Sequence, residues 1–86
     1  MVRIITGVRD KEADVYLLWY DDSAKKATRI KIEEAISAYT DRFKTRPNVV
    51  LVNEEDRADI KGVLVRSEGY IRRNNFWVGW EDAPKV

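Results

Sequence analysis

One stretch of this sequence has the spacing of an amphipathic helix, and no other stretch is long enough for more than two helical turns. Its apolar residues recur at intervals of three and four positions, which brings their side chains onto one helix face. These residues are Ile32, Ala35, Ile36, Tyr39 and Phe43. We therefore expect one long helix through residue 44 that ends before Pro47, because the residue before a proline disfavours helical dihedral angles.

The start of this helix is open within residues 24–31. These residues extend the helix by two turns in one interpretation, and Asp21, Asp22 and Ser23 then offer N-cap side chains. In the other interpretation residues 27–31 continue the sheet, because Thr28, Ile30 and Ile32 alternate in the manner of a strand.

Short runs of β-branched and aromatic residues flank the helix and predict a mixed sheet of four to five strands. These runs are residues 2–8, 15–20, 49–52, 63–66 and 75–80. The expected fold class is α+β, with one long amphipathic helix and the element order β-β-α-β-β-β.

Two connections follow from this order. Residues 9–12 are polar, and the first two strands are expected to form an antiparallel hairpin around residues 9–13. The strand at 15–20, the helix and the strand at 49–52 form a candidate βαβ unit, for which a right-handed crossover is the rule.

The two most apolar strands leave one face of the predicted sheet without an assigned cover. Residues 15–20 and 49–52 are apolar on both faces, and one helix covers only one face of a sheet. The second face is then covered by residues 54–61, by a curled sheet or by another subunit. A homodimer is the expected partner state in the last case, and its candidate contact residues are Tyr16, Tyr20, Trp77 and Trp80, because tyrosine and tryptophan bury large areas while keeping a polar group.

Length and composition predict a single domain. The chain has 86 residues, and we expect residues 1–81 to form the domain and residues 82–86 to be a frayed tail. The formal charge of +1 gives no overall attraction to nucleic acid or membrane. No apolar run approaches the ~20 residues of a membrane span, and the absence of cysteine fits a cytoplasmic location.

Catalytic and metal-binding patterns are weak. The sequence contains no histidine and no cysteine, so the commonest general base, thiol nucleophile and zinc ligands are missing. Glu54, Glu55, Asp56 and Asp59 supply carboxylates, but their spacing differs from that of a calcium loop. Acidic residues also favour a helix start, with Asn53 as its N-cap. We expect no cofactor and no metal, and the absence of histidine, cysteine and a recognisable catalytic constellation disfavours an enzymatic activity.

One basic and aromatic segment, residues 71–77, has the side chains that nucleic-acid contacts use. Guanidinium groups bind phosphate, aromatic rings stack on bases and amides bond base edges. The candidate contacts are Arg72, Arg73, Asn74, Asn75 and Trp77. The alternative is a turn before an edge strand, since asparagine tolerates the left-handed conformation of turns. A second basic group (Lys25, Lys26, Arg29 and Lys31) is expected to be a solvated face.

The sequence therefore favours a non-enzymatic protein-interaction or self-associating module whose partner is unidentified. Nucleic-acid binding through residues 71–77 is the alternative, and a metal-dependent nuclease is the third interpretation.

Overall fold

The α+β class and the order of elements predicted above are confirmed. The computed structural model describes residues 2–6 and 15–81. Its elements are β1 (Val2–Thr6), β2 (Val15–Tyr20), α1 (Thr28–Phe43), β3 (Val49–Val52), the 3₁₀ helix η1 (Glu54–Asp56), β4 (Leu64–Ser67) and β5 (Asn75–Gly79). The hairpin expected at residues 9–13 and the tail expected at 82–86 lie outside the described residues.

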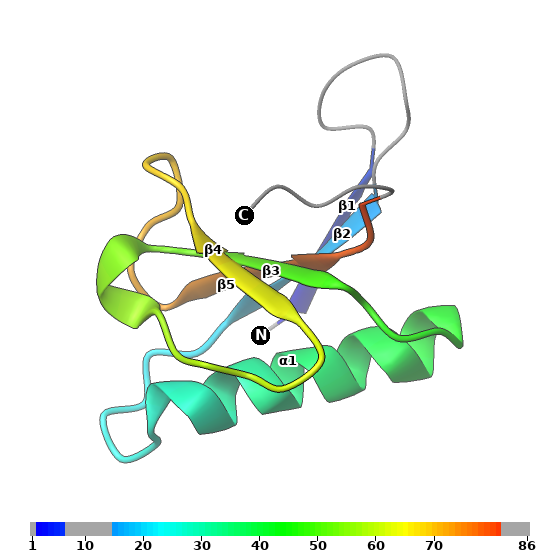
Figure 1. Cartoon of the computed structure of the whole chain (residues 1–86). Coiled ribbons are helices and arrows are strands. Elements are labelled where there is room, and N and C mark those ends of the chain that lie inside the picture. The colour runs from blue at the N-terminus through cyan, green and yellow to red at the C-terminus, as the bar shows by residue number, and fades with distance from the viewer. Residues whose placement is uncertain (1, 7–14, 82–86) are drawn as a thin grey trace.

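The sheet is mixed and has the strand order β1-β2-β5-β3-β4 (Figure 1). β5 pairs antiparallel with both β2 and β3, while β3 and β4 pair in parallel. β2 and β3 therefore run parallel to each other, as in a βαβ unit, but β5 lies between them. β5 thus occupies the centre of the sheet, so the expectation of an edge strand after the turn at residues 72–74 is wrong.

The helix begins at Thr28, which settles its open start. With 16 residues it is shorter than the full span that the sequence allowed. Ala27 is the N-cap and makes no side-chain cap bond; the side chains of Asp21 and Ser23 instead accept hydrogen bonds within the preceding turn. At the other end Lys44 is left-handed (φ 61°), and its N–H donates to the Thr40 carbonyl at 2.8 Å.

One face of the sheet packs against α1. Its buried cluster contains the helical residues Ile32, Ala35, Ile36 and Tyr39 together with Leu17, Val50, Val52, Phe76 and Val78. Ala58 and Ile60, from the crossover between η1 and β4, pack on the same cluster. Four residues of the predicted helix stripe are thus buried and Phe43 is partly buried, and residues 54–61 add cover to the face that α1 already covers.

The opposite face receives its cover from the connection between β4 and β5. Ile71 packs there against Tyr16, Val49 and Leu51, and each of these side chains is at most 1% exposed. The most apolar part of the second face is therefore covered within one chain. No helix in residues 2–6 or 15–81 is long and apolar enough to cross a membrane.

Candidate functional site

The segment considered for nucleic-acid contact begins with a turn that is anchored on a buried carboxylate, and its residues 75–77 belong to β5. Asp56 ends η1 and is 2% exposed. Its oxygens accept hydrogen bonds from Arg73 Nε (3.2 Å to each) and from the Asn74 N–H (2.7 Å). Asn74 is left-handed (φ 66°), as expected for asparagine in a turn, and its Oδ1 accepts from Lys31 Nζ at 3.3 Å.

These contacts use most of the polar groups of the segment. Arg73 Nη1 also donates to Glu55 at 3.0 Å, and the hydrogen bond to Asp56 is the main reason why the pKa of Arg73 is raised. The Asn75 amide donates to the Arg73 carbonyl at 3.0 Å. Arg72 is exposed and makes no ion pair with any residue that the structure describes. Of the two arginines, only Arg72 is therefore free to meet a phosphate.

Two residues of the basic group at the start of α1, Lys26 and Arg29, are paired with carboxylates. Lys26 Nζ lies 3.2 Å from Asp21 and 2.8 Å from Glu34, and both contacts raise the pKa of Lys26. Arg29 pairs with Glu33 at 3.0 Å one helical turn away. The pKa of Asp21 is lowered, first by the hydrogen bond from the Ser23 N–H and then by Lys26. Lys26 and Arg29 therefore form a solvated, internally compensated surface, whereas Lys31 is only 7% exposed, so the expectation of a solvated face is wrong for this residue.

The acidic residues after β3 form the short 3₁₀ helix η1. Asn53 is the N-cap of η1, as predicted, and its Oδ1 accepts from the Glu55 N–H at 2.9 Å. Within the described ranges, no group of three or more acidic, histidine or cysteine side chains is placed to hold a metal ion.

An apolar patch remains on the sheet face opposite α1. We define the aromatic patch as Leu18, Tyr20, Tyr70 and Trp77. Leu18 and Trp77 are paired across β2 and β5 and are partly buried, whereas Tyr20 is 41% and Tyr70 54% exposed. The Trp77 ring centroid lies 5.6 Å from that of Tyr70 and 5.8 Å from that of Tyr16.

The four residues predicted for self-association thus lie in three different places. Tyr20 and Trp77 belong to the aromatic patch. Tyr16 lies beneath it and is 1% exposed, so its ring is already buried within the chain. Trp80 is 53% exposed and follows the end of β5, outside the patch. Tyr70 was not predicted, because a lone tyrosine after a glycine carries no periodic signal.

An ionic network crosses the remainder of the same face. Glu81 Oε2 lies 3.0 Å from Arg66 Nη2 and accepts from the Tyr16 hydroxyl at 3.0 Å. Arg66 Nε also pairs with Glu68 at 2.8 Å. The bond to Glu81 is the main cause of the raised pKa of Arg66. The sequence analysis did not predict this network. Its one signal in the sequence is Arg66, a charged residue within a run of strand-forming residues.

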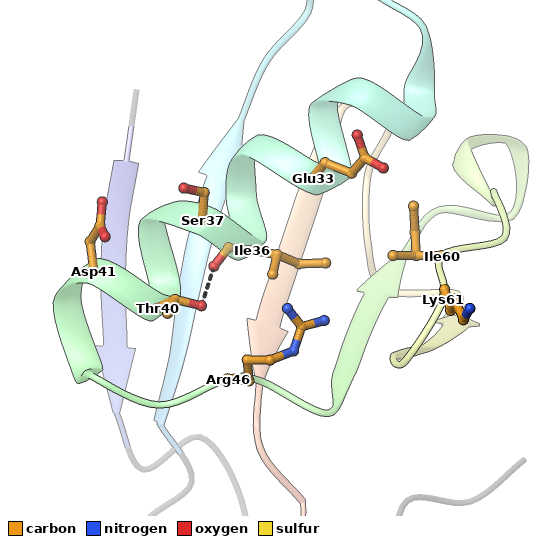
Figure 2. Close-up of a pocket in the computed structure, with 8 residues that line it drawn as sticks. All are labelled: Glu33, Ile36, Ser37, Thr40, Asp41, Arg46, Ile60 and Lys61. Atoms are coloured by element: carbon orange, nitrogen blue, oxygen red, sulfur yellow. Dashed lines mark hydrogen bonds between the residues drawn. The ribbon is translucent and has the colours of Figure 1, made fainter.

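A cleft of about 420 Å³ separates the second half of α1 from the crossover (Figure 2). Ile36 and Ile60 face each other across it, and the Arg46 guanidinium lies below the Ile36 side chain in the view of Figure 2. The Thr40 hydroxyl donates to the Ile36 carbonyl at 2.9 Å. Ser37 also lines the cleft, and no base of the described part of the chain is hydrogen-bonded to its hydroxyl. The cleft therefore shows no activated nucleophile.

A second hollow, of about 400 Å³, lies beside β4. It is lined by Glu54, Arg57, Ala58, Asp59 and Val65.

No family model, no curated protein and no solved structure matches this chain.

Proposed function

We propose that this domain is a non-enzymatic protein-interaction module that associates with a second copy of itself through the aromatic patch. The observation that carries the proposal is the exposure of Tyr20 and Tyr70 beside the half-buried Trp77 and Leu18, on a sheet face that no helix of the described residues covers. Tyrosine and tryptophan dominate binding energy at protein interfaces, because a rigid ring buries a large area at a small entropic cost.

The charges near the patch support a second copy as the partner. Tyr20 pairs with Asn75 across the sheet, so the exposed Asp22 and Arg72 lie at the same end of the sheet. A two-fold interface brings one surface against itself. When a rim that carries both positive and negative charges faces its own copy, there is no net repulsion between the two. A rim with charges of one sign would repel its copy and oppose self-association. The proposal includes a cytoplasmic location, which the absence of cysteine from the sequence supports.

Sedimentation equilibrium between micromolar and hundreds of micromolar protein tests the proposal. We expect a mass above 10.1 kDa at the upper end of this range. Tyr70→Ala is expected to weaken association about tenfold, a loss that is typical of an interface aromatic. Trp80→Ala removes an equally exposed aromatic outside the patch and is the matched control.

Three outcomes would contradict the proposal. A wild-type protein that stays monomeric over the whole range excludes self-association at these concentrations. Loss of association in Trp80→Ala but not in Tyr70→Ala places the interface outside the patch. Salt-sensitive retention on DNA that Arg72→Ala abolishes would instead favour nucleic-acid binding.

A further inference from the structure

The outer edge of β4 has unused backbone hydrogen-bonding groups. β4 is the last strand of the sheet and borders β3 on one side only. The Leu64 N–H donates to Asn48 and the Glu68 N–H to Val52, each at 3.0 Å, so the even-numbered residues of this strand bond toward β3. The two-residue period of a strand then directs the amides and carbonyls of Val65 and Ser67 outward.

This edge is accessible. All four residues of β4 are partly exposed, Val65 and Ser67 included. In the described part of the chain, no backbone hydrogen bond outside the ladder engages either amide.

The hollow beside β4 lies next to these outward groups. Val65 lines it, and the Val65 side chain also packs on the cluster beneath α1, so the hollow is on the α1 side of the edge. Glu54 and Asp59 are exposed, and neither pairs with a cation among residues 2–6 and 15–81. Among the described residues that line the hollow Arg57 is the one cation, so these residues carry an excess of negative charge.

We propose that the β4 edge binds an extended segment of a partner protein as a sixth strand, with a lysine or arginine of that segment opposite Val65. Main-chain hydrogen bonds to Val65 and Ser67 supply affinity in this mode of recognition, and side-chain pockets supply specificity. The aliphatic stem of the cation covers Val65 and Ala58, while its charged end reaches Glu54 and Asp59.

The geometry disfavours a second copy of this chain as the occupant. Only one antiparallel register pairs both outward residues of each β4, with Val65 of one copy opposite Ser67 of the other. That register sets Arg66 opposite Arg66, and like charges directly opposite each other destabilise a sheet. It also brings serine rather than a cation to the hollow. This edge therefore differs from the aromatic patch in both position and partner.

The experiment uses a defined probe, a capped five-residue peptide that alternates valine and threonine around a central lysine. Its control has glutamate at the centre. Both are titrated into the ¹⁵N-labelled full chain, and amide hydrogen exchange is followed. We expect the lysine peptide to slow exchange at Val65 and Ser67 and to bind about threefold more tightly than the glutamate peptide, as a partly exposed charge contact allows. Glu54→Gln with Asp59→Asn should abolish this preference.

Val65→Pro provides the sharpest variant. It removes an outward N–H and leaves the bonds to β3 intact, and proline is tolerated at strand edges. We expect it to abolish peptide binding, while Val65→Ala retains it. The proposal is overturned if neither peptide binds, if both bind equally, if Val65→Pro binds normally, or if the slowed amides lie elsewhere. If Val65→Pro does not fold, exchange at Val65 and Ser67 in the wild-type chain still decides the question.

Discussion

At the scale of single residues, Asp56 connects two segments that are distant in sequence. The carboxylate ends η1 directly after the buried strand β3 and receives donors from the turn that precedes β5. A buried carboxylate is stable only when donors satisfy its oxygens, and here a guanidinium and a backbone amide do so. Asp56 thereby fixes the entry of the central strand β5 into the sheet.

Asp56→Ala is expected to lower the free energy of unfolding by about 2 kcal/mol, because charged hydrogen bonds are lost and the Asn74 amide is left without its acceptor. Urea denaturation measures this change. Glu55→Ala is the control, since Glu55 contacts the same Arg73 from a side chain that is 72% exposed. Its urea midpoint is expected to stay at the wild-type value. Equal midpoints for the two variants would show that Asp56 does not anchor the turn.

At the scale of elements, α1 depends on its packing more than on its ends. Its N-cap contributes no side-chain hydrogen bond, and its last turn closes on a left-handed lysine rather than on glycine. Most helical stability in proteins comes from burial of one face, and α1 buries Ile32, Ala35 and Ile36 against β2 and β5.

Ile36→Asp is expected to unfold the domain, because an unpaired charge in this core consumes much of the ~5–15 kcal/mol that holds a domain together. Circular dichroism during heating should show no cooperative transition. Ser37→Asp places the same charge on the neighbouring, exposed position and should melt close to the wild-type temperature. A cooperative transition of Ile36→Asp near that of the wild type would show that the buried helix face is incorrectly assigned.

Local patterns were readable from the sequence, whereas pairing between distant segments was not. The helix stripe, the strand at 49–52 and the Asn53 cap each depend on neighbours a few positions away, and all three were predicted. The position of β5 between β2 and β3 depends on contacts across more than twenty residues, and alternation contains no information about such partners. Arg66 was assigned to a strand, but its partner Glu81 is supplied by the chain beyond β5.

At the scale of the whole molecule, the two faces of the sheet are closed by different means. α1 and the crossover cover one face with aliphatic side chains. The other face is closed over β3 by Ile71 and by the contact of Arg66 with Glu81, beside the aromatic patch. Because Glu81 also contacts Tyr16, its side chain links β2 to β4 across the two strands that lie between them.

A double-mutant cycle on Arg66 and Glu81 measures this link. Each side chain is 18% exposed, so water screens the pair less than it screens a surface contact. We expect the single alanine variants to couple by about 1 kcal/mol in urea denaturation, a value at the upper end for ion pairs that retain some exposure. The same cycle on Arg29 and Glu33, whose side chains are 56% and 45% exposed, is the matched control and should give about 0.3 kcal/mol. Coupling of Arg66 with Glu81 that is no larger than in the control would show that Ile71 and the strands close this face without the ionic network.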